Sequence, residues 1–452
     1  MKTSIAFGTN GIRGNANEFP FTKQTLKILG KAIGRWALRR YKKDKPVVLI
    51  GCDTRISGER IKNFLTYGLQ SIQLKVLDGK ILSTPAVCQL VVKEEGIDFG
   101  IVVSASHNPY YDNGIKFFSG TKELFCDVDE KNIINNVKLL QKETSRLDNK
   151  KTQEEVVDWH DAFSVYKKNI ISYFKKGFLK NIRVVLDCAH GATYSIAPML
   201  FRFFGAEVIT IASTPNGKNI NDSCGTLYPN KLKQAVLDFK ANIGFAFDGD
   251  GDRVIAVNKD GEIKDGDDII TLLMKLPQYC CMPTVVATIM SNKGFENFVV
   301  NDGKQLVRTA VGDKYIVASM KESSLLLGGE ASGHVVLWDY LSTGDGVFVA
   351  LRVLESIILT KNWTMSTFSR TPQVTLNVSI DERDDLSSRP YSDIILEHKR
   401  WLDKGRIIVR FSETEKKLRI MAESEDESLT KNVAESLSKK LKLALSKKSL
   451  SY

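Results

Sequence analysis

Three stretches of the chain repeat the same order of apolar and polar positions. Each begins with a short apolar run that ends in a polar or glycine-containing loop: VVLIGCDTR from Val47, RVVLDCAHGAT from Arg183 and TVVATIMSNKG from Thr284. A helical stretch and a further strand-like segment follow, and then a third apolar run opens into SASHNP, DGDGDR or GGEASGH. Strands that alternate with helices favour mixed or parallel sheets, in which ligands gather at the strand ends. The pattern predicts three similar α/β domains with mixed sheets and puts the three loops at equivalent positions.

The chain from about Thr371 has a different pattern. The segments PQVTLNVSI, RIIVRFS and KLRIMAES alternate apolar and polar residues as antiparallel strands do, and residues 429–446 are amphipathic at helical spacing. This predicts a C-terminal α+β domain. We predict four domains, over residues 1–155, 156–256, 257–369 and 370–452.

Length and composition agree with a globular protein of several domains. The chain has 452 residues, of which 43% are hydrophobic and 26% are charged. Its longest apolar runs are far shorter than a membrane span, and the beginning, MKTSIAFGTNG, has no apolar signal-peptide region. We therefore expect a cytoplasmic protein without a membrane partner.

Charge and cysteine content exclude two further classes. The formal net charge is +11, but the lysines are dispersed or lie in the tail KKLKLALSKKSLSY, without the aromatic-interleaved basic stripe of a nucleic-acid-binding surface. No nucleic-acid partner is expected. The 7 cysteines form no CxxC pair, so neither a zinc site nor a disulfide framework is predicted.

The segment FGIVVSASHNPYYDNGIK, residues 99–116, carries the first candidate chemistry. It is an apolar run that breaks into a loop in which Ser106 precedes His107, and Lys116 follows. A serine becomes a nucleophile when a base or nearby charge activates it, which makes Ser106 a candidate nucleophile or phosphate carrier. His107 is a candidate acid or base because an ordinary imidazole titrates near neutrality. An ordinary turn of Ser, Asn, Pro and Gly is the alternative.

The second candidate is the loop between the apolar runs 243–247 and 254–257. Asp248, Asp250 and Asp252 alternate with glycines, so hard oxygen ligands can converge on one cation such as Mg²⁺. A calcium EF-hand is excluded because Arg253 and Lys259 stand where that loop needs Gly and Glu. An acidic turn without a cation would leave three like charges uncompensated.

Four motifs occur in the order found in the α-D-phosphohexomutases: FGTNGIRG (7–14), SASHNP (104–109), DGDGDR (248–253) and GGEASGH (328–334). The chain resembles this superfamily over almost its whole length. Within it, the tracts VLDCAHGATY, PNGKNIN and RTAVGDKYI make the chain most similar to the phosphoglucosamine mutase family. The resemblance implies that the active site lies in a central cleft of four domains.

The resemblance also implies roles for individual residues. Ser106 would carry the phosphoryl group, with His107, Lys116 and Arg13 as further catalytic residues. One Mg²⁺ per chain would be held by Ser106, Asp248, Asp250 and Asp252. The residues implied in substrate binding are Arg253, Glu330, Ser332, Arg410, Ser412, Thr414 and Arg419. His190 and His334 are interpreted as ordinary histidines without a catalytic role.

The C-terminal loop RFSETEKKLR departs from the RxSGTEP that is usual in the family. Glu413 replaces glycine and Lys416 replaces proline, so an acidic side chain stands in a loop that would bind phosphate. Without the resemblance, the pattern favours a polar hairpin with a solvated basic rim over a phosphate-binding loop. Asn10 and Ala331 are milder departures, where aspartate and glutamine are common.

The function implied by the resemblance is a mutase that converts glucosamine 6-phosphate into glucosamine 1-phosphate for amino-sugar nucleotide and peptidoglycan precursor synthesis. A bisphosphorylated hexose would be its intermediate and activator. Phosphoglucomutase or phosphomannomutase activity is one alternative, and a sugar-phosphate-binding paralogue without turnover is another. The sequence leaves open whether the protein is a monomer or a homodimer.

Overall fold

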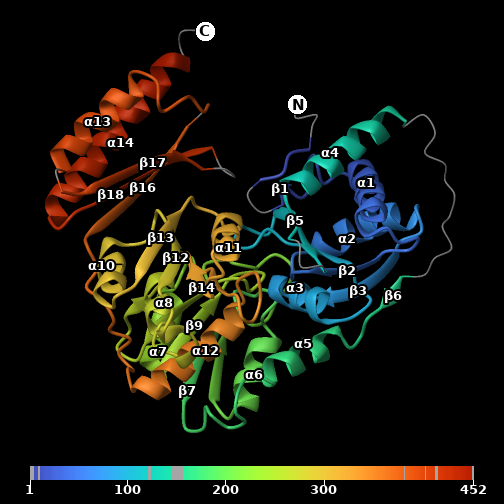
Figure 1. Cartoon of the computed structure of the whole chain (residues 1–452), viewed down its shortest axis with the longest axis horizontal. Coiled ribbons are helices and arrows are strands. Elements are labelled where there is room, and N and C mark those ends of the chain that lie inside the picture. Colours follow the sequence, from blue (N-terminus) through green and yellow to red (C-terminus); the bar gives the residue numbers. More distant parts are fainter. Residues whose placement is uncertain are drawn as a thin grey trace. The chain divides into compact units, whose positions relative to one another are not determined.

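A computed structural model of the chain (Figure 1) describes residues 5–8, 11–120, 124–143, 156–380, 382–402, 404–412 and 416–449. The chain forms two compact units. One comprises Met1–Thr288 and Val307–Ser366, and the other comprises Ile289–Leu306 and Thr367–Tyr452. The four-domain boundaries given above stay a prediction.

The first sheet of the larger unit has six strands in the order β1-β5-β4-β2-β3-β6. Strand β2 pairs in parallel with β3 and β4, whereas β5 pairs antiparallel with β4 and β1, so the sheet is mixed. Every residue of β4 is buried, as expected for an apolar strand covered on both faces. The strands are β1 (Ile12–Asn15), β2 (Val47–Cys52), β3 (Lys75–Ile81), β4 (Phe99–Val103), β5 (Asp112–Ser119) and β6 (Val157–Asp158), and the helices are α1 (Lys23–Tyr41), α2 (Gly58–Gln70), α3 (Thr84–Lys93) and α4 (Asp127–Lys142).

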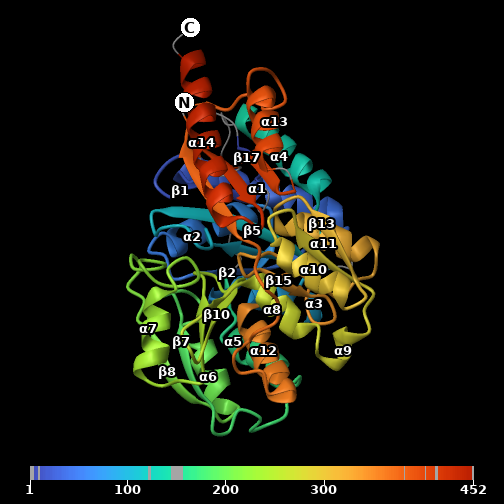
Figure 2. The ribbon, with the colours of Figure 1, turned by 90° about the vertical axis from the view of Figure 1, so that its left-hand side faces the viewer.

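The second sheet has the order β11-β10-β9-β7-β8, again with parallel pairing of β7 to β8 and β9 and antiparallel pairing of β9 to β10. Helix α6 packs on β8, and α7 packs on β7 and β9. Helices α6 and α7 and strands β7 and β8 are among the green elements of Figure 2. The elements are α5 (Ala162–Ile171), β7 (Arg183–Asp187), α6 (Ile196–Phe203), β8 (Glu207–Ile211), α7 (Asn230–Asp238), β9 (Ile243–Phe247), β10 (Val254–Asn258) and β11 (Ile263–Lys264).

The third sheet has the order β13-β12-β14-β15. Strand β14 pairs in parallel with β12 and antiparallel with β15. Helix α8 begins with a capping box in which the Asp265 side chain accepts from the backbone of the first turn. The elements are α8 (Gly266–Leu273), α9 (Pro277–Cys280), β12 (Thr284–Thr288), β13 (Gln305–Thr309), α11 (Asp313–Glu322), β14 (Leu327–Gly329), β15 (Val335–Leu337) and α12 (Gly346–Thr360).

The three sheets confirm the predicted repeat. In each, a strand (β4, β9 or β14) pairs in parallel with the first strand of its repeat (β2, β7 or β12), and a loop then turns the chain into an antiparallel neighbour. SASHNP lies between β4 and β5, DGDGDR between β9 and β10, and EASGH between β14 and β15. The three loops therefore occupy equivalent positions.

The smaller unit contains an antiparallel sheet of order β16-β18-β17. Its apolar face packs on two helices and forms a separate core that includes Ile420, Leu418 and Leu437. The elements are α10 (Lys293–Asn301), β16 (Gln373–Ser379), α13 (Tyr391–Leu402), β17 (Arg406–Phe411), β18 (Lys417–Glu423) and α14 (Glu427–Ser449). The predicted fold class, three α/β domains with mixed sheets and a C-terminal α+β domain, is confirmed.

Two further findings concern the classes excluded above. All 7 cysteines are free, and 4 of them are buried. None of the described helices combines the length and the hydrophobicity that a membrane span requires.

Candidate active site

Ser106 follows β4 and is buried, with 1% of its surface exposed. Its backbone adopts the left-handed conformation at φ 54°, which is uncommon for a residue other than glycine and often marks a functional site. The Ser106 Oγ donates to Asp248 Oδ2 at 2.6 Å. The first two candidate loops, which come from two different sheets, therefore meet at the predicted nucleophile.

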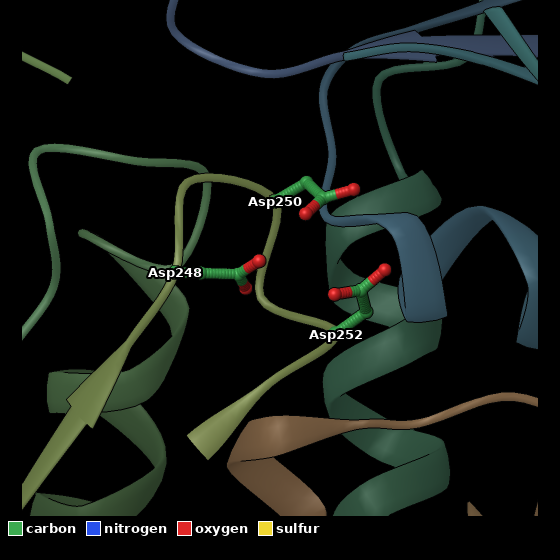
Figure 3. Close-up of side chains that lie close together, drawn as sticks. All are labelled: Asp248, Asp250 and Asp252. Carbon is green, nitrogen blue, oxygen red and sulfur yellow. The ribbon is translucent and has the colours of Figure 1, made fainter. Parts of the chain in front are cut away.

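The metal-ligand candidates lie together as predicted. Asp248, Asp250 and Asp252 are all buried, and one carboxylate oxygen from each lies within 4.8 Å of the others (Figure 3). Burial, together with the charges of Asp252 and Asp250, raises the pKa of Asp248 well above its ordinary value. This arrangement of carboxylates can hold a metal ion.

Lys116 partly neutralises this cluster from β5. Its Nζ is 2.6 Å from Asp250 Oδ2 and 2.8 Å from Asp252 Oδ2, and the side chain is buried. Burial disfavours the ammonium ion, but Asp250 and Asp252 outweigh that cost and raise the Lys116 pKa. Lys116 is therefore a fixed positive charge.

Two carboxylate oxygens of the cluster remain for a cation. Among the hydrogen bonds of the described residues, the buried Oδ1 atoms of Asp250 and Asp252 have no partner. The Thr84 hydroxyl, in the first turn of α3, and Lys116 both bind the other oxygen of Asp250. Buried acceptors without donors are costly, and hard oxygen ligands suit Mg²⁺, so the residues present fit this metal.

His107 does not have the near-neutral pKa expected from the sequence. Its Nδ1 lies 3.4 Å from Ser106 Oγ. Burial and the positive charges of Arg253 and Arg13 lower its pKa well below the ordinary value, so the ring is neutral at pH 7. Burial and Arg253 also lower the pKa of Arg13, in β1, whereas Asp250 and Asp252 oppose this shift.

Arg253 ends the metal loop, and its backbone N–H donates to Asp248 Oδ1 at 3.2 Å. Burial disfavours its charge, but the carboxylates of Asp252, Asp248 and Glu330 raise its pKa. Its guanidinium is thus a cation beside the predicted sugar-binding loop.

The loop between β14 and β15 orients Glu330 and Ser332. The Glu330 carboxylate accepts from the Gly312 backbone N–H at 2.9 Å and from the Ser332 hydroxyl at 3.1 Å. Ser332 is exposed and Glu330 is buried. A fixed carboxylate beside an exposed hydroxyl can recognise vicinal sugar hydroxyls.

His334 belongs to this site, although the sequence interpretation gave it no role. It is buried, with Nδ1 3.8 Å from Asp252 Oδ1, and Nε2 accepts from the Gly344 N–H at 3.2 Å. Burial disfavours its charged form, but Asp252, Asp313 and Glu330 raise its pKa. The available signal was that His334 is the last residue of the motif GGEASGH.

The smaller unit holds the remaining candidates. Arg410 in β17 stands directly opposite Arg419 in β18, and Ser412 follows β17 with its side chain buried. Two arginines therefore lie opposite one another across this hairpin. Thr414 and the departure at Glu413 lie outside the described residues, as does Asn10.

Gly249 separates the first two metal-ligand candidates and allows the two loops to meet. A Cβ at this position would lie 2.6 Å from the Ser106 carbonyl oxygen and 2.8 Å from Asn221 Nδ2. Both distances are shorter than a Cβ atom tolerates. The closer contact is with a backbone atom, so relieving it requires the Ser106 loop to shift.

We therefore expect Gly249→Ala to push the Ser106 loop away from Asp248. Because displacement of a reacting group by about 1 Å can cost about 10²-fold in rate, turnover should fall by roughly that factor. Steady-state kinetics and magnesium titration of the purified variant would measure the effect. If Gly249→Ala has wild-type kinetics, the Ser106 loop and the metal loop do not meet as described.

Comparison with known proteins gives four domain matches along the chain. They are phosphoglucomutase/phosphomannomutase alpha/beta/alpha domain I at residues 4–144, domain II at 164–261, domain III at 265–373 and the C-terminal domain at 395–440.

Curated relatives match almost end to end. The chain is 39% identical to the phosphoglucosamine mutase of Chlamydia caviae, covering 95% of this chain and 96% of that protein. It is 40% identical to the phosphoglucosamine mutase of Thermodesulfovibrio yellowstonii, covering 95% and 97%.

Solved structures share the fold at lower identity. A phosphoglucomutase/phosphomannomutase family protein from Burkholderia thailandensis has a TM-score of 0.78 at 20% identity, covering 97% of both chains. The N-acetylphosphoglucosamine mutase of Aspergillus fumigatus in complex with GlcNAc-6P and magnesium has a TM-score of 0.66 at 17% identity, covering 98% of this chain and 96% of that one. With four matching domains in order and relatives aligned over nearly their full length, the chain belongs to the phosphoglucosamine mutase family of the phosphohexomutases.

Proposed function

We propose that the protein interconverts glucosamine 6-phosphate and glucosamine 1-phosphate, and that Ser106 carries the transferred phosphoryl group. The observation that supports this most strongly is the 2.6 Å hydrogen bond from Ser106 Oγ to Asp248, in a buried carboxylate cluster that retains two oxygens without hydrogen-bond partners among the described residues. The name of the relatives supports glucosamine phosphate as the substrate. The product would enter amino-sugar nucleotide and peptidoglycan precursor synthesis.

In the proposed first half-reaction, the bond from Ser106 Oγ to phosphorus breaks while a sugar hydroxyl oxygen bonds to that phosphorus. The proton that the sugar hydroxyl loses balances the one that Ser106 Oγ gains. Neutral His107 lies close enough to Ser106 Oγ to relay it. The bisphosphorylated sugar then turns over and returns its other phosphate to Ser106.

Charge would be the main contribution of the remaining groups, because phosphoryl transfer depends chiefly on positioning and electrostatics. Lys116, Arg13 and Arg253 supply fixed positive charge around Ser106. Asp248, Asp250 and Asp252 would hold Mg²⁺ together with the Ser106 phosphate, and the bound ion would offset negative charge on the phosphoryl group.

Substrate orientation is proposed to come from two loops. Glu330 and Ser332 would hydrogen-bond the sugar hydroxyls. Arg410, Ser412, Thr414 and Arg419 would hold the phosphate that is not reacting.

The test of this function is turnover of purified protein on glucosamine 6-phosphate, glucose 6-phosphate and mannose 6-phosphate, with magnesium and a trace of the bisphosphate activator. We expect glucosamine 6-phosphate to give the highest kcat/KM. Preference for glucose or mannose phosphate would replace this proposal with phosphoglucomutase or phosphomannomutase activity. No turnover on any of them would favour a binding paralogue.

The C-terminal loop yields a separate prediction. Arg410→Ala should weaken substrate affinity by about 1.5–3 kcal/mol because a charge-assisted hydrogen bond is lost. Glu413→Gly should lower KM more than it changes kcat, because a carboxylate in this loop opposes the anionic ligand in ground state and transition state alike. KM measured over a range of ionic strengths would report both effects.

Arg400→Ala is the matched control for Arg410→Ala, since Arg400 is an exposed arginine of α13 in the same unit. It should leave KM unchanged. If Arg410→Ala and Glu413→Gly behave like this control at every salt concentration, the loop does not contact phosphate.

A further inference from the structure

The backbone of the Ser106 loop is held by a buried arginine from the neighbouring strand end. Arg55 follows β2 and is only 3% exposed. Its Nη2 donates to the carbonyl oxygens of Ser106 at 2.9 Å and Asn108 at 2.7 Å, and its Nη1 donates to those of Pro109 and Asp112. One guanidinium therefore binds four carbonyls of the loop.

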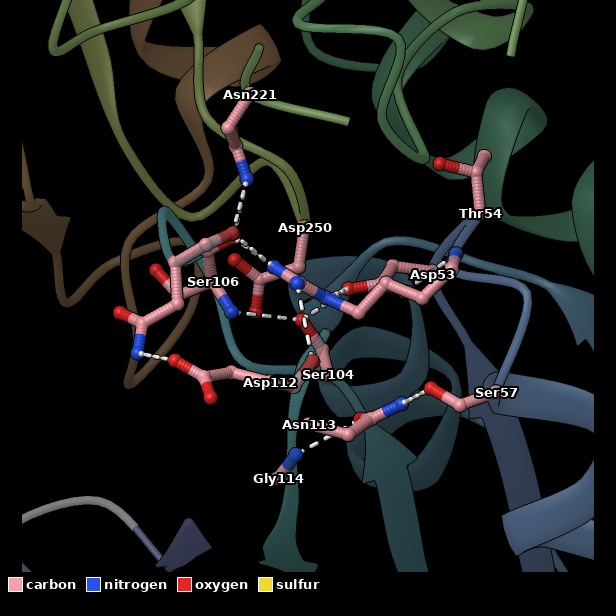
Figure 4. A network of polar contacts seen from close by, with 12 residues as sticks. Asp53, Thr54, Ser57, Ser104, Ser106, Asp112, Asn113, Gly114, Asn221 and Asp250 are labelled. Carbon is pink, nitrogen blue, oxygen red and sulfur yellow. Dashed lines mark hydrogen bonds and ion pairs between the residues drawn. The ribbon is translucent and has the colours of Figure 1, made fainter. Parts of the chain in front are cut away.

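Arg55 is itself oriented by Asp53. The Arg55 Nε donates to Asp53 Oδ2 at 2.9 Å, and the same oxygen accepts from the Ser104 hydroxyl at 2.7 Å. Ser104 Oγ in turn accepts from the Ser106 N–H at 2.9 Å (Figure 4). The loop is thus held at both its N–H and its carbonyl groups.

A second side chain, from another sheet, binds two of the same carbonyls. Asn221 lies in the connection between β8 and α7, and its Nδ2 donates to the Ser106 oxygen at 2.9 Å (Figure 4). The same Nδ2 donates to the Asn108 oxygen at 3.1 Å. It is 8% exposed and has φ 58°. The carbonyl of Ser106 accordingly accepts one bond from Arg55 and one from Asn221.

These two donors fix the direction of the Ser106 side chain. A carbonyl with both acceptor positions occupied cannot rotate without breaking a hydrogen bond, so the peptide plane after Ser106 is locked. Because φ of Ser106 is left-handed, release of that plane would let the residue relax toward a commoner conformation and move Oγ from Asp248.

We propose that Arg55 and Asn221 are positioning residues that aim Ser106 Oγ at the metal loop through both half-reactions. This inference rests on the proposed function, in which Ser106 carries the phosphoryl group. Asn221 has the more specific role, since it ties the first α/β sheet to the second at the reacting serine.

Asn221→Gly and Asn221→Asp test this role. Glycine accepts the positive φ but removes the donor. Aspartate keeps the size and shape of asparagine but presents acceptor oxygens to two carbonyls, so it should be more damaging than glycine. A residue needed only for its shape would give the opposite order.

We expect Asn221→Gly to lower kcat by roughly 10- to 100-fold, since a displaced reacting group can cost about 10²-fold, with little change in KM for glucosamine 6-phosphate. Asn221→Asp should lower kcat further. Phosphorylation of Ser106 by the bisphosphate activator, followed by rapid quench and intact mass, should slow in parallel.

Ser223→Gly is the matched control. Ser223 lies in the same connection, is exposed and has φ 53°, and its hydroxyl bonds to Asp222. This variant should keep wild-type kcat and wild-type Ser106 phosphorylation. Arg55→Lys extends the test, because one ammonium cannot reproduce the planar array of donors; it should lower kcat without changing KM.

Amide hydrogen exchange of the peptide over residues 104–112 separates this inference from the proposed function. Exchange should rise in both Asn221 variants and stay at the wild-type rate in Ser223→Gly, whether or not the protein is a mutase. Unchanged exchange and unchanged kcat in Asn221→Asp would overturn the inference. A rise in KM alone would also overturn it, because Asn221 would then act on the substrate and not on Ser106.

Discussion

Ser106→Ala is expected to reduce mutase turnover by at least about a thousandfold, since a covalent carrier is seldom replaceable. The buried hydroxyl that donates to Asp248 would be gone, and no phosphoryl group could be attached at that position. Intact-mass analysis of the wild-type protein should show a fraction with one phosphate, and peptide mapping should place it on Ser106.

Ser104→Ala is the control for this result. Ser104 is a buried serine of the same loop whose hydroxyl bonds to Asp53 and to the Ser106 N–H. This variant should still be phosphorylated on Ser106, although more slowly. Full activity of Ser106→Ala would show that Ser106 does not carry the transferred phosphoryl group.

Asp250→Asn should weaken magnesium binding and lower turnover while the protein stays folded, because a hard cation loses a charged oxygen ligand. The substitution would leave Lys116 with a single charged partner, Asp252. Asp260→Asn, an exposed aspartate between β10 and β11, is the control and should titrate with magnesium like the wild type. Activity that survives complete chelation would show that the loop is structural.

The same cluster gives a pH dependence for metal binding. Burial and the neighbouring carboxylates raise the pKa of Asp248 in the metal-free protein, so a cation has to displace a proton from it. The apparent magnesium affinity should therefore increase with pH until Asp248 is ionised. Calorimetric titrations with magnesium at several pH values would measure this increase. An affinity independent of pH would contradict the prediction.

The sequence predicted the parts of the site that are local in the chain. The apolar runs that lead into SASHNP, DGDGDR and GGEASGH are strands, and each loop turns into an antiparallel neighbour as the repeated pattern predicted. The three aspartates converge because glycines alternate with them, which is a property of the loop itself.

What could not be predicted depends on contacts between distant segments. Asn221 reaches Ser106 across 115 positions, and nothing in PNGKNIN indicates that its last residue will contact a loop of another sheet. The pKa of His107 follows from burial beside Arg253 and Arg13, which sequence spacing does not reveal. The proximity of His334 to Asp252 also comes from tertiary structure, so the sequence gives no sign of it.

The most direct test of the central claim is a single turnover of the isolated phosphoprotein with glucosamine 6-phosphate in the presence of magnesium. We expect Ser106 to lose its phosphate as an equal amount of glucosamine 1,6-bisphosphate forms, and chelation of the metal to stop both changes. Formation of glucosamine 1-phosphate while the phosphate on Ser106 stays in place would contradict it.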